Sequence, residues 1–255
     1  PELVEKFKKK LAKAPAAAAP EWVPEGQSQA RQVQNQRVYA AMLQSLDESL
    51  GRILAKIDQL GLVWNTVIIS TSDNGGVSTA EGAPTSNAPL RAGKGWPYEG
   101  GVGEPLLVRW PGVTATNSQC ETPVMSTDYY PTLLEIAGLP QLPSQHVDGR
   151  SLVPLLKGGT VGERRLFWHY RHYSNQGGGP CGAIRVGDLK LIEWYEDMRV
   201  ELFNLKNDLG EMSDLSKTQP EQARALQQQL HDWRASLKAG MPTPNPDWVP
   251  SGGKR

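Results

Sequence analysis

The stretch "TVIISTSDNGG", residues 66–76, joins an apolar, β-branched run to an acidic, glycine-rich turn. The run at 67–69 does not alternate with polar residues, which is typical of a strand buried on both faces in a parallel sheet. Asp73 and Asn74 follow the carboxyl end of that strand, the edge where open α/β sheets gather ligand and metal sites. The alternative is a simple turn, because Asp-Asn-Gly also bonds its own backbone.

Another glycine-rich segment, "GKGWPYEGG" at residues 93–101, places Lys94 between two glycines. A lysine exposed in this way is a compact cation that can bind an anionic group. The alternative is an ordinary solvated loop, because a lone Gly-Lys-Gly is no more specific than a lone Asp-Asn-Gly turn. Asp73 and Asn74 offer hard oxygen atoms, which suit Ca²⁺ or Mg²⁺ rather than zinc. Arg91 and Glu99 flank Lys94, and they either orient it or pair with each other; we expect the pairing.

Hydrophobic periodicity and breaker residues divide the rest of the chain into elements. We expect helices at 2–13, 28–60, 127–139 and 219–238. We expect strands at 65–70 and 104–110, then a meander of four short strands between 164 and 205. The apolar stripe of helix 28–60 is interpreted as core. The expected division is an α/β part at 1–160 and a small antiparallel subdomain with a closing helix and Pro-rich tail at 161–255.

Composition excludes several classes of protein. The 255 residues contain 27 Lys and Arg against 27 Asp and Glu, which argues against nucleic acid or an anionic membrane as the main partner. No apolar run reaches about 18 residues, so no membrane-spanning segment is expected. The N-terminus does not have the pattern of a signal peptide. Two cysteines, Cys120 and Cys181, rule out a disulfide scaffold.

The two glycine-rich segments together carry a family resemblance. "TVIISTSDNGG" and "NAPLRAGKGWPYEGGVGEPLLVRWPG" resemble the C-terminal half of the sulfatase catalytic domain, within the alkaline phosphatase superfamily. "STDYYPTLLEIAGLP", "DGRSLVPLLKG" and the helix before the first strand are also similar to that family, and "HYRHYSNQGG" is similar to arylsulfatase-A-like and N-acetylgalactosamine-6-sulfatase-like members. The resemblance implies an α/β fold, namely the second half of a three-layer, largely parallel sandwich followed by a small antiparallel sheet and a helix.

The resemblance also implies roles for particular residues. Asp73 and Asn74 would bind a calcium ion, with magnesium as the alternative, and Lys94 would bind a sulfate oxygen and help the ester oxygen leave. The substrate would be a sulfated small molecule or glycan. We further hypothesise that His169, His172 and Asn175 contact its sugar or aryl part. An aromatic core strand followed by a polar turn explains these three residues equally well.

The sequence lacks the rest of the family's machinery. No C/S-x-P-S-R motif is present to give the formylglycine nucleophile, and the upstream acidic pair of the metal site is also absent. Calcium takes about six to eight oxygen ligands, of which Asp73 and Asn74 supply about two or three. We therefore expect the chain to be inactive without a missing N-terminal half. A phosphatase or phosphonate hydrolase of the same superfamily, or a non-catalytic truncated protein, is the alternative. The resemblance also implies an extracytoplasmic location.

Overall fold

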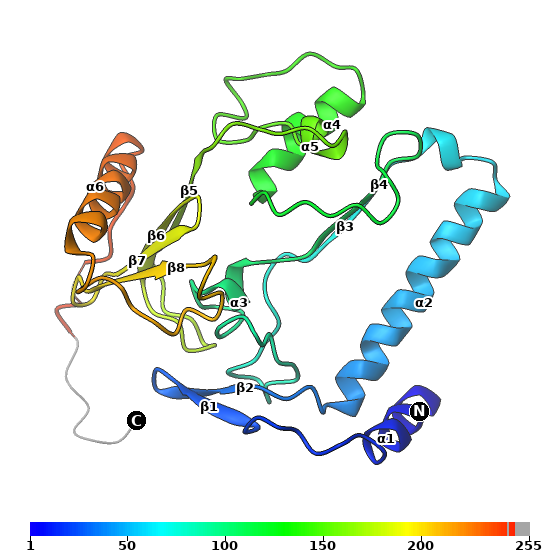
Figure 1. The fold of residues 1–255 in the computed structure, drawn as a ribbon, viewed down its shortest axis with the longest axis horizontal. Helices are drawn as coiled ribbons and strands as arrows, with labels where there is room; N and C mark the ends of the chain where they lie inside the picture. Colours follow the sequence, from blue (N-terminus) through cyan, green and yellow to red (C-terminus); the bar gives the residue numbers. More distant parts are fainter. Residues whose placement is uncertain (244, 248–255) are drawn as a thin grey trace.

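The computed structural model describes residues 1–243 and 245–247, so most of the predicted Pro-rich tail lies outside the described residues. Figure 1 shows the order of the elements. The first part contains α1 (Glu2–Leu11), β1 (Trp22–Glu25), β2 (Ser28–Arg31), α2 (Arg37–Gln59), η1 (Val63–Asn65), β3 (Ile68–Thr71), α3 (Glu99–Val102), β4 (Leu106–Arg109), η2 (Ser126–Asp128), α4 (Tyr129–Ile136) and α5 (Val153–Leu156). The second part contains β5 (Arg165–Tyr170), β6 (Cys181–Val186), β7 (Leu189–Trp194), β8 (Val200–Asn204) and α6 (Pro220–Ser236).

The second part agrees with its prediction. Strands β5 to β8 form an antiparallel sheet in sequential order, and α6 covers one face of it. That face contributes the fully buried side chains of Ile184, Leu191 and Leu202, which pack against Leu226 and Leu230 of α6. Side chains alternate along a strand, and the residues of the opposite face, Ala183, Ile192 and Phe203, are also buried, so another part of the chain covers that face.

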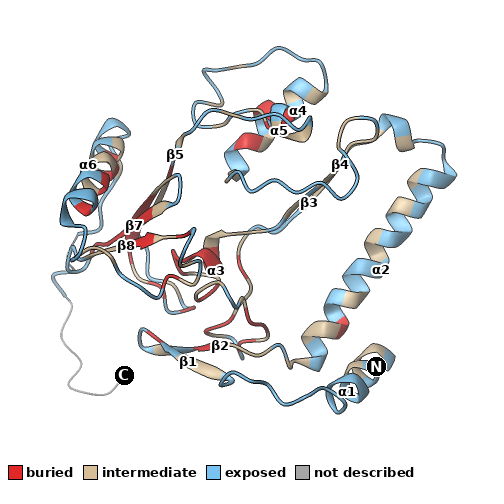
Figure 2. Cartoon of the chain, in the orientation of Figure 1, coloured by how far each residue is buried: buried red, intermediate tan, exposed pale blue. Residues whose placement is uncertain are grey.

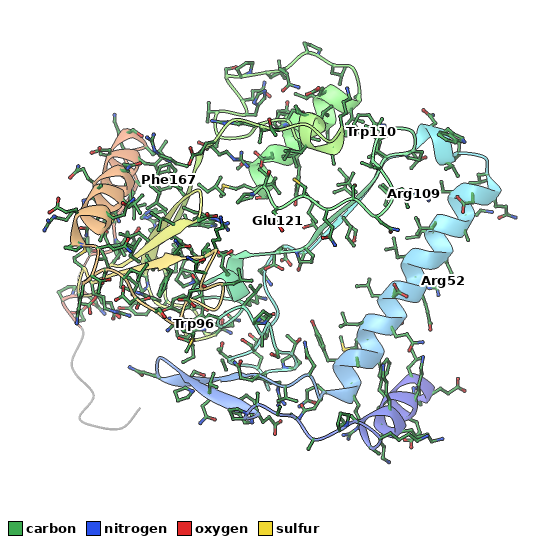
Figure 3. All side chains as sticks on the ribbon, in the orientation of Figure 1. Arg52, Trp96, Arg109, Trp110, Glu121 and Phe167 are labelled. Atoms are coloured by element: carbon green, nitrogen blue, oxygen red, sulfur yellow. The ribbon has the colours of Figure 1, made fainter. Side chains whose placement is uncertain are left out.

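The cover on the opposite face is the glycine-rich segment of residues 93–101. Ala183, Ile192 and Phe203 of the sheet share one buried cluster with Trp96 and Tyr98. Figure 3 shows Trp96 between this sheet and the hairpin of β1 and β2. The segment that carries Lys94 therefore rests directly on the C-terminal sheet, and the division of the chain near residue 160 stays a prediction.

The start of the long helix was predicted wrongly. Residues 28–31 form β2, which pairs antiparallel with β1 across a tight turn at Gly26, and α2 begins only at Arg37. A buried side chain explains the difference, because Arg31 donates from Nε to the Ala83 carbonyl at 2.6 Å and from its guanidinium to Glu21 at 2.6 Å. These long-range bonds override the local helix propensity.

The two strands β3 and β4 pair with each other in antiparallel register, from Ile68 opposite Arg109 to Thr71 opposite Leu106. All sheets in the described residues are antiparallel, so the parallel neighbours expected for β3 are not found in this part of the chain. The expected burial on both faces is also wrong here, because β3 is only partly buried. The apolar run at 67–69 lacks a cover on one side.

The apolar stripe of α2 also lacks a cover, which corrects its assignment to the core. Only Ala41 is buried in this helix, whereas Met42, Leu46 and Ile53 are 57% to 67% exposed. Figure 2 shows α2 in the colours of exposed and intermediate residues along most of its length. The helix packs against α1 and lies apart from the C-terminal sheet (Figure 1). In the described residues no helix is both long and apolar enough to cross a membrane.

Candidate active site

The turn that carries Asp73 and Asn74 begins where β3 ends, as the sequence predicts. Asp73 is exposed and Asn74 is half-buried. Asn74 donates from Nδ2 to the carbonyl of Gly75 at 3.0 Å, which leaves its amide oxygen as the atom that can face a cation. The two side chains therefore present oxygen atoms at the carboxyl end of the strand.

The Asp73 turn and the Lys94 loop form one unit because their glycine backbones touch. The Gly75 amide donates to the Gly101 carbonyl at 3.2 Å, and the Lys94 amide donates to the Gly76 carbonyl at 3.2 Å. A Cβ atom on Gly75 would lie 1.8 Å from the Gly100 carbonyl oxygen, so only glycine permits this approach. The structure thus brings the carboxylate, the amide and the lysine onto adjoining loops.

Asn87 ties these two loops together, although sequence reasoning missed it. Its Nδ2 donates to the carbonyls of Gly76 and Ala92, both at 2.8 Å, and its Oδ1 accepts from the Gly76 amide at 3.1 Å. A single side chain therefore bonds both the metal-side turn and the lysine loop. Asn87 is the first residue of the segment "NAPLRAGKGWPYEGGVGEPLLVRWPG", but the local sequence gave no signal of its contact with the Gly76 turn.

The Lys94 side chain is half-buried and remains available for a ligand. Within residues 1–243 and 245–247, no carboxylate forms an ion pair with its ammonium group. The expected pairing of its neighbours is wrong, because Arg91 pairs with Glu25 at 2.8 Å and Glu99 pairs with Lys190 at 2.8 Å. An uncommitted cation on a fixed loop can bind an anionic group.

Glu104 is a further acidic residue beside Asp73 that sequence reasoning missed. The β3–β4 register sets Thr71 opposite Leu106, and its continuation brings Glu104 opposite Asp73. Burial, followed by the negative charge of Asp73, raises the pKa of Glu104 above its ordinary value. Its Oε1 atom is buried and has no hydrogen-bond partner in the described residues. The sequence did offer a signal for this residue, because Glu104 is an acidic residue that lies just before β4, the strand that pairs with β3.

The oxygen atoms of Asp73, Asn74 and Glu104 fit a hard cation in kind but are too few to enclose it. The described residues contain no group of three or more His, Cys, Asp or Glu side chains that could hold a metal ion. The orphaned Glu104 oxygen near a second carboxylate is the environment that a divalent cation would neutralise. The remaining ligands of a calcium ion would have to come from outside these residues.

The three residues predicted to contact substrate are in different situations. Both ring nitrogens of His169 have partners inside the chain, with Nδ1 2.7 Å from the Tyr195 hydroxyl and Nε2 3.0 Å from the Gly240 carbonyl. His172 is exposed and lies edge-on to Tyr170. Asn175 is exposed and donates to Glu81 at 3.0 Å. Geometry thus favours a structural role for His169 and leaves His172 accessible.

The loop at 171–180, which carries His172 and Asn175, packs beside the Lys94 loop. Trp96 Nε1 and Thr79 Oγ1 both donate to the Gln176 carbonyl, at 3.0 and 2.6 Å. A Cβ on Gly178 would lie 1.7 Å from the Gly95 carbonyl oxygen, so the two backbones are in direct contact. The structure therefore places the loop after β5 next to the proposed anion site, although the two segments are distant in sequence.

The arrangement places a lysine beside a set of oxygen donors on adjoining loops, and comparisons with known proteins identify the family to which the chain belongs. The family described as "Sulfatase" matches residues 2–139. The family described as "N-sulphoglucosamine sulphohydrolase, C-terminal" matches residues 92–239. Each match covers more than half of the chain, which therefore belongs to the sulfatase family of the alkaline phosphatase superfamily.

Individual relatives agree with this assignment. A sulfatase from Formosa agariphila is 38% identical over 229 residues, which cover 80% of this chain and 40% of that protein. Human arylsulfatase A is 38% identical over 148 residues, which cover 58% of this chain and 29% of that protein. The chain thus spans about two fifths or less of the length of these curated relatives.

A solved structure shows the same fold. The structure of BT4656 in complex with its substrate D-glucosamine-2-N,6-O-disulfate superposes with a TM-score of 0.66 and 27% identity. The superposition covers 80% of this chain and 41% of that one. This neighbour confirms the predicted fold class, the alkaline-phosphatase-like α/β fold, although the sheets within the described residues are antiparallel.

Proposed function

We propose that this chain supplies the cation-binding and sulfate-binding part of a sulfuric ester hydrolase. The contact of the Lys94 amide with the Gly76 carbonyl at 3.2 Å carries the proposal, because it holds the lysine next to the Asp73 turn. Family membership supports the reaction, and the oxygen donors of Asp73 and Asn74 support the ion. Calcium is the ion we propose, with magnesium as the alternative.

Each residue has a separate task in the proposed reaction. Asp73 and Asn74 would hold the cation, which supplies charge neutralisation at the sulfuryl oxygens when it is bound. Lys94 would donate a hydrogen bond to a sulfate oxygen and stabilise the negative charge that grows on the ester oxygen as the alcohol leaves. A formylglycine nucleophile would come from outside this chain, because no C/S-x-P-S-R sequence occurs in it.

The missing N-terminal half of the catalytic domain is the partner that we propose for this chain. The exposed stripe of α2 and the half-covered strand β3 are two apolar surfaces that such a segment would bury. The longer relatives support this proposal, since the chain spans 40% of the Formosa agariphila protein. We also propose an extracytoplasmic location, on family resemblance alone.

We propose a sulfated glycan or a small sulfated molecule as the substrate. BT4656 acts on a sulfated glucosamine, which supports this class. The accessible His172 and the neighbouring Asn175 lie on the loop beside Lys94, where they could contact a sugar or aryl group. We assign His169 to holding the end of β5 through Tyr195 and Gly240.

The test compares 4-nitrophenyl sulfate with 4-nitrophenyl phosphate in the assembled protein that contains this chain. The sulfate ester should be hydrolysed with the higher kcat/KM, and Lys94→Ala should lower that value by about 10²- to 10³-fold, because one electrostatic contact to the transition state is lost. The 255-residue chain alone should be inactive.

Lys206→Ala is the matched control, because Lys206 is exposed on the C-terminal subdomain and should leave kcat/KM unchanged. A higher kcat/KM on the phosphate ester would instead support the phosphatase or phosphonate hydrolase alternative. No hydrolysis of either ester by the assembled protein would support the non-catalytic alternative.

A further inference from the structure

A buried cluster of charges lies between the glycine-rich loop and the C-terminal sheet. Lys190 Nζ is 2.8 Å from Glu99 Oε1 and 2.9 Å from Glu211 Oε1. Arg185 adds a second cation, 3.2 Å from Glu99 Oε2. Lys190 and Glu211 are completely buried and Glu99 is 6% exposed, so none of the three can reach a substrate.

The cluster is costly to bury, which points to a role other than stability alone. Removing charges from water costs several kcal/mol for each ion, and apolar residues of similar size often fill such a site equally well. What the ions provide is a fixed geometry, since Lys190 Nζ lies between one oxygen of Glu99 and one oxygen of Glu211, and this ion pair is the only contact of Glu211 Oε1 with a polar group in the described residues. The question is therefore which part of the molecule the cluster fixes.

Both stems of the Lys94 loop are bonded to Glu211. At one stem, Arg91 donates from its guanidinium to the Glu211 carbonyl at 2.9 Å. At the other stem, the Glu99 amide donates to Glu211 Oε2 at 2.6 Å. Lys94 lies between these two stems, so residue 211 closes the loop that carries it.

Aromatic packing supports the inner side of the same loop. The Arg91 guanidinium lies 3.7 Å from the centre of the Tyr98 ring, and the Tyr98 hydroxyl donates to Glu201 of β8 at 2.8 Å. Trp96 and Tyr98 are buried against the sheet. The base of the loop is therefore formed largely by the C-terminal sheet, together with Glu25 of β1, which pairs with Arg91.

We propose that Glu99, Lys190 and Glu211 are positioning residues that fix the Lys94 ammonium for its anionic ligand. The C-terminal sheet then belongs to the anion site, because it packs against the loop that carries Lys94 and fixes the position of that loop. The effect of this positioning on catalysis rests on the function proposed above. The coupling between the charge cluster and the order of the Lys94 loop does not depend on that function.

The coupling is tested by hydrogen exchange in the 255-residue chain. In Lys190→Met, residues 91–103 should exchange about tenfold faster or more than in wild type, since two carboxylates lose their shared cation and local opening becomes easier. Strand β6 should change less than the loop. The double variant Lys190→Met/Glu211→Gln should partly restore loop protection, because it removes the unbalanced charge.

Leu230→Ala is the matched control, because Leu230 is fully buried on the α6 face of the same sheet. This control should weaken the sheet without a selective effect on residues 91–103. If Lys190→Met does not fold, Glu211→Gln alone keeps the side-chain volume and gives the same readout. Loop exchange that matches the Leu230→Ala control in every variant would overturn the proposal.

Kinetics in the assembled enzyme separates positioning from a loss of folded protein. A displaced Lys94 should raise KM for 4-nitrophenyl sulfate and lower kcat together, whereas a smaller folded fraction lowers only the apparent kcat. If hydrogen exchange in Lys190→Met rises selectively at residues 91–103 but the assembled protein does not hydrolyse sulfate esters, the proposed function is rejected and the coupling stands. Unchanged KM together with unselective exchange would reject the coupling itself.

Discussion

At the residue scale, the candidate site depends on how closely two glycine-rich backbones approach each other. Gly75 faces the Gly100 carbonyl and Gly93 faces the Gly76 carbonyl, at distances where no Cβ atom fits. The loops that carry Asp73 and Lys94 meet only because these glycines permit it, which the proposed function requires. Glycine here has a steric task in addition to its backbone freedom.

Gly75→Ala tests this steric task. The new methyl group would lie 1.8 Å from the Gly100 carbonyl oxygen, so the loops must separate, and the free energy of unfolding should fall by about 1–3 kcal/mol. Urea denaturation measures the change. Gly51→Ala in α2 is the control: its Cβ meets nothing within 4 Å, and it should raise stability by about 0.5–1 kcal/mol. Equal effects of the two substitutions would contradict the account.

Sequence motifs singled out Asp73, Asn74 and Lys94 as candidates, because each lies in a glycine-rich segment with a recognisable local pattern, and the structure places their loops side by side. The structure adds Asn87 and Glu104, whose roles depend on contacts between segments. Local pattern carries no information on such contacts. The pairing of Arg91 with Glu25 and of Glu99 with Lys190 was missed for the same reason.

At the scale of elements, the C-terminal sheet followed from the sequence because short apolar runs are separated by turns with Gly or Asp, and α6 because its apolar residues recur three to four positions apart. The β1–β2 hairpin did not, since its register depends on Arg31 bonding to Ala83 and its amide bonding to Ser78. The helical period of α2 was predicted correctly but the burial of its apolar stripe was not, because in the described residues α2 packs against α1 and Met42, Leu46 and Ile53 stay exposed.

The docking of α6 on the sheet should depend on acid pH through Glu193 of β7. This carboxylate is fully buried and accepts hydrogen bonds from three α6 side chains, Gln227, His231 and Arg234. Burial alone would raise the pKa of Glu193, but those hydrogen bonds and the Arg234 charge outweigh it and hold the pKa below its ordinary value. A carboxylate whose pKa is lowered by folding stabilises the folded state at any pH above its ordinary pKa. That stabilisation is lost as the pH falls through the lowered pKa.

Glu193→Gln should lower the free energy of unfolding at pH 7 by about 3 kcal/mol, because Arg234 loses its buried partner. The difference from wild type should shrink as the pH falls below about 4.5, the ordinary pKa of the group. Thermal unfolding across pH 3–7 measures it. Glu221→Gln, on an exposed side chain of α6, is the control and should change little. A constant difference at every pH would refute the role of Glu193.

At the scale of the whole molecule, the described chain buries its largest clusters around the C-terminal sheet and leaves α2 and β3 partly uncovered. The proposed anion site lies on loops that pack on the C-terminal sheet and adjoin the partly buried strand β3. This distribution agrees with the proposal that the chain supplies the lysine of the site and only some of the ligands of its cation.

The most direct measurement is a crystal structure of the assembled protein with calcium and sulfate. The account predicts a cation bound by the oxygens of Asp73 and Asn74, and a sulfate oxygen within hydrogen-bond distance of Lys94 Nζ, with the α2 stripe covered. An Asp73 carboxylate that points into solvent, with neither ion beside it nor anion at Lys94, would contradict the central claim.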